Sequence, residues 1–236
     1  MIKKKDKTIK ILAPIYGLSF ICKKIVINSK IIIRSTDTDK EDNLLKSSGF
    51  NWIKYQTIVD IQYKYKQSNI DEPYPAIYFL LNRIESALRV FNPGIIGFAG
   101  IISQPQVSPF PVCIEKTTPS GQDQYKIDST KLIKFPDFYK KFIIAYSKKQ
   151  IAFNRFSKSC SSAPVTKVSE DKIIDYCICL ENLFIPFKSR EKNSFIRQGL
   201  VMLRFPQKDI EKIDILYQYR SSIMHADLGK QYNVPI

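Results

Sequence analysis

The only histidine of the chain stands close behind an arginine, in a segment whose residue types could act on a phosphate group. His225 follows Arg220 by five positions within ILYQYRSSIMHADLGK, residues 215–230. Histidine exchanges a proton near neutral pH, and arginine holds phosphate through paired hydrogen bonds. Ser221 adds a hydroxyl that could bind phosphate or orient the histidine. The plainer alternative is that His225 is a surface or capping residue near a helix C-terminus, where a cation is favourable.

Helical spacing places Arg220 where a charge needs a partner. At roughly 100° per residue, Arg220 falls near the middle of an apolar arc on the last helix. His225 falls about one-third of a turn from the edge of that arc, on the same side as Ser221, a position that suits a residue that lines a groove. A lone charge in a core costs several kcal/mol, roughly, so Arg220 requires an anionic partner or an opening to a ligand. The arc consists of Ile210, Ile213, Leu216, Tyr217, Ile223 and Met224.

Glu181 is the expected partner of Arg220. The segment DKIIDYCICLENLFI, residues 171–185, is apolar nearly all round, which is typical of a buried helix. Asp171, Asp175 and Asn182 share a narrow face that we expect to be solvated. Glu181 lies roughly 100° from that face, towards the core. We predict that Glu181 meets Arg220, directly or through water; the alternative is an ion pair that only fixes the register of two helices.

The order of patterns along the chain predicts an α+β protein with two domains. Residues 1–130 form an expected β-rich accessory or sensor domain, and residues 131–236 an expected all-α antiparallel bundle. Alternating or apolar runs predict strands near the N-terminus and at 23–36, 57–67, 94–103 and 110–117, and one helix at 76–91. Four further helices with short connections are expected at 137–158, 171–185, 190–205 and 206–227.

Composition bounds the partners and the compartment. The net charge of +15 favours RNA, DNA or an anionic membrane surface as partner, although a Lys-, Ile- and Asn-rich composition of AT-rich coding would also produce it. Five cysteines form no CxxC pair, and with one histidine they predict no structural metal site. Reduced thiols and the lack of a membrane-spanning run fit a cytoplasmic protein. The sequence contains no Gly-rich phosphate loop and no carboxylate cluster, so it predicts neither a nucleotide nor a metal cofactor.

These segments together resemble a HEPN domain (higher eukaryote and prokaryote nucleotide-binding), in particular its Apea-like branch. The family's mark is an arginine, a polar residue, a few residues and then a histidine, which stands here as Arg220-Ser221-Ser222-Ile223-Met224-His225. The segment LYQYRSSIMHAD is similar to the motif helix of that branch, and CLENLFIP to its acidic helix. SALRVFNPGIIGFAGI also resembles the accompanying N-terminal domain. The chain departs from the family at Ala226, where glycine is usual.

The resemblance implies a metal-independent endoribonuclease without a cofactor, acting in antiviral defence or as a toxin. Arg220 would stabilise the phosphorane, His225 would serve acid–base catalysis, Ser221 would assist, and Glu181 would hold Arg220. The family resemblance implies a homodimer through the HEPN bundle, which would bring two copies of Arg220 and His225 to one cleft. RNA, including tRNA, is the expected partner, with an antitoxin or regulatory protein as another. Asp227 stands where a toxin sub-branch carries a modified tyrosine.

Two other functions remain open from the sequence. The first is a non-enzymatic HEPN module that binds RNA or nucleotides through Arg220 and His225. The second is a structural interaction protein in which Arg220 is sealed against Glu181 and His225 lies on an unrelated surface.

Overall fold

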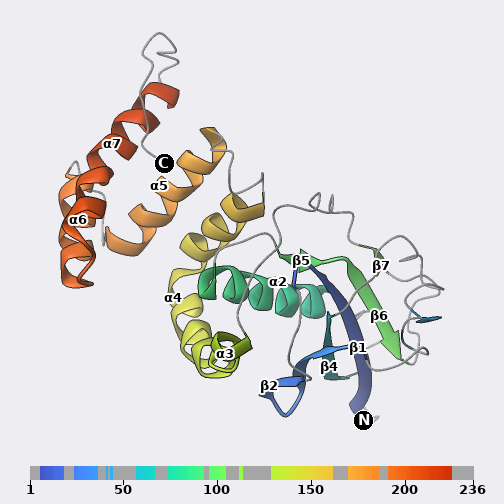
Figure 1. Ribbon diagram of the computed structural model, residues 1–236. Helices are drawn as coiled ribbons and strands as arrows, with labels where there is room; N and C mark the ends of the chain where they lie inside the picture. Colours follow the sequence, from blue (N-terminus) through green and yellow to red (C-terminus); the bar gives the residue numbers. More distant parts are fainter. Residues whose placement is uncertain are drawn as a thin grey trace, which may run out of the picture. The chain divides into compact units, whose positions relative to one another are not determined.

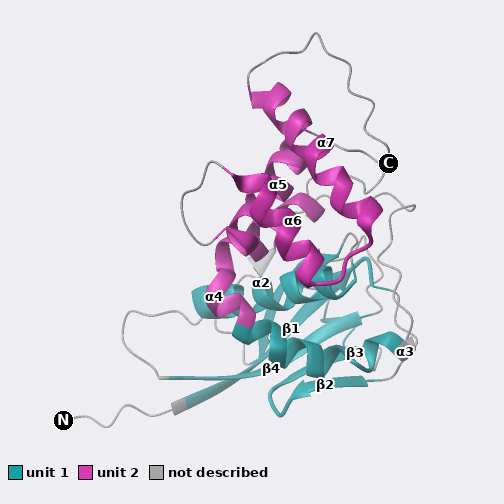
Figure 2. Cartoon of the chain, turned by 90° about the vertical axis from the view of Figure 1, so that its left-hand side faces the viewer, with its two compact units in different colours: residues 1–144 teal, residues 145–236 magenta. Residues whose placement is uncertain are grey.

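The chain folds into a strand-rich first unit and a helical second unit, residues 1–144 and 145–236 (Figure 2). The predicted α+β class, with strands first and helices after, is confirmed (Figure 1). The structure is a computed structural model. It describes residues 6–18, 24–36, 41, 43–44, 57–66, 74–92, 96–104, 112–113, 129–161, 170–185 and 191–224.

The first unit is built on one seven-stranded sheet in the order β2-β3-β4-β1-β6-β7, with β5 paired to β1. Every strand pair in it is antiparallel. The long central pair of β1 and β4 runs from Asp6 opposite Lys66 to Ile15 opposite Thr57. The strands are β1 (Asp6–Tyr16), β2 (Lys24–Asn28), β3 (Ile31–Ser35), β4 (Thr57–Lys66), β5 (Gly97–Phe98), β6 (Gly100–Gln104) and β7 (Val112–Cys113).

The strand region predicted at 23–36 is confirmed, and it forms the two paired strands β2 and β3. Asn28 begins the turn, and its Oδ1 accepts a hydrogen bond of 2.8 Å from the Lys30 backbone N–H. This use of an asparagine side chain is typical of tight turns. Along β2 buried and exposed residues alternate, because successive side chains of a strand point to opposite faces.

Helix α2 (Tyr74–Phe91) lies against this sheet (Figure 1) and carries a buried ion pair. Arg89 Nη2 lies 2.8 Å from Glu85 Oε1. The Nε and Nη2 of Arg89 also donate to the Ile96 carbonyl, at 3.2 and 2.6 Å. Both charges are buried and hydrogen-bonded, which is the condition under which a folded protein tolerates them.

The division between the units falls inside α4 (Phe135–Ser161), whereas the change in residue character suggested 130/131. The start of α4 carries aromatic side chains that pack on the end of α2. The ring of Phe91 lies 5.4 Å from that of Phe135 and 5.0 Å from that of Phe138, measured between centroids. These contacts attach the first turns of α4, together with the short α3 (Ser129–Leu132), to the first unit.

The second unit contains the rest of α4 and the helices α5 (Glu170–Phe184), α6 (Lys192–Met202) and α7 (Gln207–Met224), as predicted. Its core joins Ile196 and Leu200 of α6 to Ile210 and Ile213 of α7. Phe184 of α5 packs so close to Gly199 that a Cβ there would lie 2.1 Å from the ring, so this helix contact requires glycine. The C-terminal half of the predicted apolar arc on α7 is more open, and Met224 is exposed.

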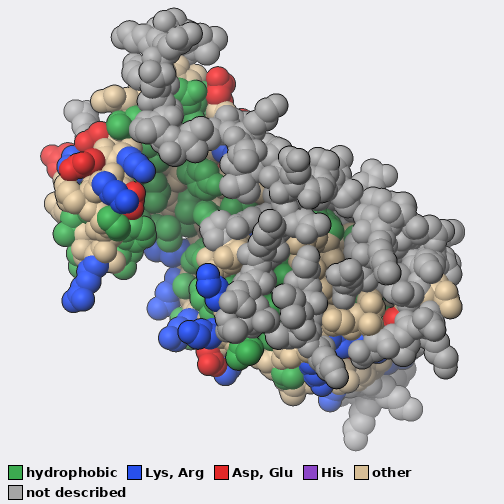
Figure 3. All heavy atoms as spheres, viewed as in Figure 1, with side chains coloured by type: hydrophobic (Ala, Val, Ile, Leu, Met, Phe, Trp, Pro, Cys, Tyr) green, Lys and Arg blue, Asp and Glu red, His purple; other side chains and the backbone are tan. Residues whose placement is uncertain are grey.

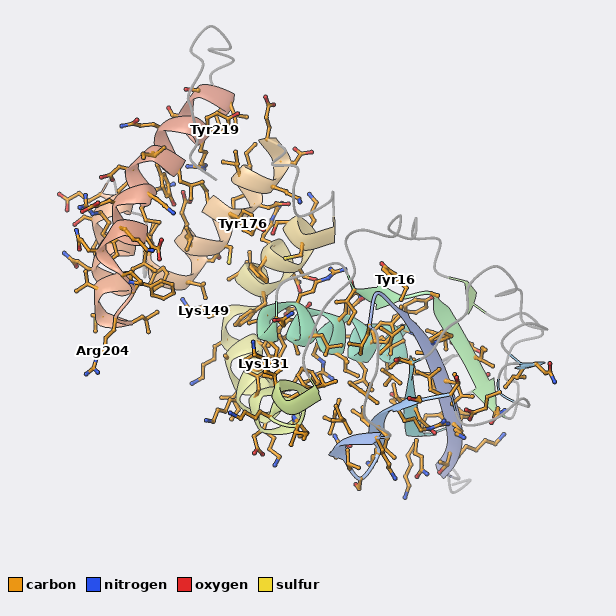
Figure 4. The ribbon with its side chains drawn as sticks, viewed as in Figure 1. Tyr16, Lys131, Lys149, Tyr176, Arg204 and Tyr219 are labelled. Carbon is orange, nitrogen blue, oxygen red and sulfur yellow. The ribbon has the colours of Figure 1, made fainter. Side chains whose placement is uncertain are left out.

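A tight reversal links α6 to α7. The Phe205 N–H donates to the Leu200 carbonyl (3.0 Å) and the Arg204 N–H to the Val201 carbonyl (2.9 Å), the pattern of a Schellman motif. Arg204 occupies the left-handed position, with a φ of 57°, and its side chain projects away from the helices (Figure 4). Hydrophobic side chains at this reversal are exposed (Figure 3), namely Val201, Met202, Leu203 and Phe205.

No helix among the described residues is long and apolar enough to cross a membrane.

Replacing Arg204 by glycine is expected to stabilise the second unit. Glycine adopts the left-handed conformation without the steric cost of a Cβ, so Arg204→Gly should raise the free energy of unfolding by about 0.5–1 kcal/mol. Arg204→Ala removes the same charge but keeps the Cβ, and should give no such gain. Urea unfolding of both variants measures the difference. Equal stability of the glycine and alanine variants would show that Arg204 is not strained.

Candidate functional site

Arg220 lies on α7 in an ion pair with Glu181 of α5, as predicted. Its Nη1 is 3.1 Å from Glu181 Oε1. The side chains of Arg220 and Glu181 are 24% and 17% exposed, so neither charge is sealed from solvent. The complete sealing that a purely structural ion pair would show is therefore not observed.

Glu181 accepts hydrogen bonds from two further side chains. Its Oε2 accepts from Lys192 Nζ at the start of α6, at 3.0 Å. Its Oε1 also accepts from the hydroxyl of Tyr217, one turn before Arg220, at 3.3 Å. We call Glu181, Lys192, Tyr217 and Arg220 the Glu181 cluster. One carboxylate thus connects α5 to both α6 and α7.

The formal charge of the Glu181 cluster is +1, because two cations share one carboxylate. The guanidinium also lies over the Tyr217 ring, with 5.8 Å from Cζ to the centroid. Nε of Arg220 is buried and has no hydrogen-bond partner among the described residues. Excess positive charge in a partly desolvated place attracts an anion more strongly than the same charge in bulk water does.

The Tyr217 hydroxyl and the Cys177 thiol are both protonated at neutral pH. Burial, reinforced by the negative charge of Glu181, raises the pKa of the Tyr217 hydroxyl well above its ordinary value. That hydroxyl therefore remains a hydrogen-bond donor and is no general base at neutral pH. Burial raises the pKa of the Cys177 thiol to about 11, so Cys177 is not a reactive thiolate.

The other two predicted site residues follow Arg220 along the chain. Ser221 is exposed on α7, directly after Arg220, where its hydroxyl is open to a ligand. His225 lies outside the described residues, immediately beyond Met224, the last residue of α7. The structure therefore joins Arg220 to Glu181 and gives no position for the histidine.

The sequence analysis did not single out Lys192. It lies on a helix that begins eleven positions after Glu181, and only the packing of α6 against α5 brings the two charges together. One local feature could have pointed to Lys192. It is the first residue of a helix whose first turn has no acidic residue, and the helix dipole disfavours a cation at that position.

Asp175 is buried, and its expected place on a solvated face of α5 is wrong. Arg155 Nη1 lies 2.8 Å from Asp175 Oδ1 and Lys158 Nζ lies 3.6 Å from Oδ2. The Asp175 side chain is only 4% exposed. Arg155 and Lys158 of α4 supply the compensating cations, which a helical wheel for one helix cannot reveal.

Among the described residues, no group of three or more His, Cys, Asp or Glu side chains could hold a metal ion. Cys160, Cys177 and Cys179 are buried thiols.

A comparison with protein-family models finds no match. Comparisons with curated proteins and with solved structures find none either.

The two members of the ion pair are expected to differ in their contribution to stability. Glu181→Gln leaves Lys192 and Arg220 as neighbouring cations without a counter-charge, and should lower the free energy of unfolding by about 1–3 kcal/mol. Arg220→Gln leaves a neutral Lys192–Glu181 pair. Solvent screens these partly exposed charges, so that variant should lose less than about 1 kcal/mol.

Urea unfolding at low salt tests this order, with Glu211→Gln on the exposed side of α7 as the control for loss of a carboxylate. A larger loss for Arg220→Gln than for Glu181→Gln would make Arg220 a structural residue and would contradict the account of the cluster.

Proposed function

We propose that the chain is a metal-independent endoribonuclease of HEPN type, which cleaves RNA through attack of the 2′-hydroxyl. The observation that carries the proposal is the Arg220 guanidinium, which Glu181 holds at the partly exposed surface of α7 within a cluster of net positive charge. The resemblance of residues 171–227 to the HEPN motif helices supports the same function. Antiviral defence or toxin action follows from that resemblance alone.

The residues supply the groups that this reaction needs. Cleavage by the 2′-hydroxyl requires a base for that hydroxyl, an acid for the leaving 5′-oxygen and positive charge near the phosphorane. His225 is the acid–base group, because histidine titrates near neutral pH. Arg220 stabilises the negative charge that develops on the phosphorane oxygens, and Ser221 contributes a hydroxyl beside it. Glu181 fixes the guanidinium in place and does not touch the substrate.

A homodimer completes the proposed site. One histidine per chain can supply either the acid or the base, whereas two copies facing one cleft supply both. On α7, Ser221 and the apolar Met224 are exposed, so both side chains are available for contact with a second copy. A regulatory partner such as an antitoxin would act by blocking the same cleft.

The second candidate is a non-enzymatic module that binds RNA or nucleotides. The ion pair itself favours this candidate, since a guanidinium already neutralised by Glu181 stabilises a developing charge less than a free one would. Binding without cleavage would use the same residues.

Incubation of purified protein with mixed tRNA and a structured RNA in EDTA distinguishes these functions. We expect the wild type to cleave and to leave 2′,3′-cyclic phosphate ends. His225→Ala and Arg220→Gln should each reduce the rate at least about a hundredfold, the scale of a lost acid–base or charge-stabilising group.

The matched control is Lys208→Gln, which removes one exposed cation from the start of α7. It should cleave like the wild type, and every variant should remain folded in the assay, because the stability loss expected for Arg220→Gln is below about 1 kcal/mol. Equal cleavage by wild type and His225→Ala would refute the proposed catalytic role. Salt-sensitive RNA binding without cleavage by any protein would identify the binding module.

A further inference from the structure

Lys192 occupies a position that its own helix disfavours. It is the first residue of α6, where the exposed N–H groups carry the positive end of the helix dipole. A lysine there is less favourable than an acidic or neutral residue. The Glu191 before it makes no side-chain capping hydrogen bond to α6. A residue that its local structure disfavours, and that lies at a candidate functional site, is a candidate for a functional role.

Lys192 and Arg220 point their charges at the same carboxylate from two helices. Lys192 Nζ lies 3.0 Å from Glu181 Oε2, and Arg220 Nη1 lies 3.1 Å from Glu181 Oε1. The two oxygens of one carboxylate are bonded to one carbon, so both cations lie next to the same group. A phosphate group presents its oxygens at a similar spacing and can accept hydrogen bonds from both cations.

Both cations keep hydrogen-bonding capacity. An ammonium has three donors and a guanidinium has five; among the described residues Lys192 donates one hydrogen bond to Glu181, and Arg220 forms an ion pair with it. The Lys192 side chain is 40% exposed, which leaves it within reach of a ligand. Glu181 is also held by a hydrogen bond from Tyr217, so the carboxylate can stay in place when an anion arrives.

The charge of the cluster matches one phosphodiester. Lys192, Arg220 and Glu181 sum to one positive charge, and a phosphodiester carries one negative charge, so their complex is neutral. A neutral group in a partly buried place avoids the desolvation cost that an unpaired charge incurs there. The positive end of the α6 dipole adds attraction for the same anion.

We infer that Lys192 is a second phosphate-binding residue, which together with Arg220 takes one phosphodiester group of an RNA strand. Glu181 holds both cations in position for it. This inference rests on the proposed function for the identity of the ligand, and it adds a residue from α6 to a site that the sequence placed on α5 and α7.

Binding of a fluorescent single-stranded RNA with 2′-O-methyl groups throughout tests the inference, because such RNA cannot be cleaved by its own 2′-hydroxyl. Affinity is measured over a series of salt concentrations. Loss of one phosphate contact should reduce the magnitude of the slope of log K against log salt by about 0.7, the value for a single strand. We expect Lys192→Gln to show that change with an affinity loss of about tenfold at low salt, and Lys192→Arg to retain most of the wild-type affinity.

Lys208→Gln is the control for general loss of positive charge and should keep the wild-type slope. Lys192→Gln that binds like Lys208→Gln would overturn the inference, provided that both unfold at the same urea concentration. A loss of slope shared by both variants would overturn it as well.

A parallel assay with unmodified RNA separates this inference from the proposed function. Cleavage by the wild type with normal binding by Lys192→Gln leaves the ribonuclease intact and refutes the role of Lys192. Binding that depends on Lys192, without cleavage by the wild type, supports the phosphate site and refutes the ribonuclease. Absence of RNA binding by the wild type overturns both.

Discussion

The Glu181 carboxylate joins three helices through hydrogen bonds from Lys192 and Tyr217 and an ion pair with Arg220. Because these three side chains meet one carboxylate, the ends of α6 and α7 that carry the cations are held at one place on α5. Apolar contacts also bring α6 and α7 together, but they do not fix the position of a charged side chain. These contacts involve Ile196, Leu200, Ile210 and Ile213. Glu181 therefore fixes the position of the guanidinium on which the proposed chemistry depends.

One carboxylate cannot balance the charge of two cations. The remaining positive charge makes the Glu181 cluster a candidate binding site. Elsewhere in the chain, the buried Arg89 is matched by Glu85 and by the Ile96 carbonyl, which leaves no excess charge. In the Glu181 cluster one positive charge remains, and the Arg220 Nε has no partner among the described residues. Folding has already brought this positive charge into a partly desolvated place, so it attracts an anion more strongly than it would in bulk water.

The sequence predicted those features that one helix or one hairpin determines by itself. Apolar runs on either side of Asn28 identified β2 and β3, and helical spacing alone paired Glu181 with Arg220. The sequence-based predictions were wrong where a second helix determines the burial or the partner of a side chain. Asp175 was assigned to solvent because the wheel of α5 contains no information about Arg155 and Lys158 on α4. Lys192 was missed for the same reason, and the unit boundary was placed before α4 because the packing of Phe135 and Phe138 on Phe91 is a tertiary contact.

The central claim is that Arg220, although paired with Glu181, remains available to a phosphodiester. The Nε–H of Arg220 is buried, so we expect it to exchange slowly with water and to give a resolved signal in a ¹⁵N–¹H spectrum, assigned through its loss in Arg220→Lys. Titration with a short 2′-O-methyl RNA should move that signal saturably at the concentration that half-saturates RNA binding. RNA that binds the protein while this signal stays unchanged would contradict the claim, and would make the Glu181–Arg220 pair a structural link between α5 and α7.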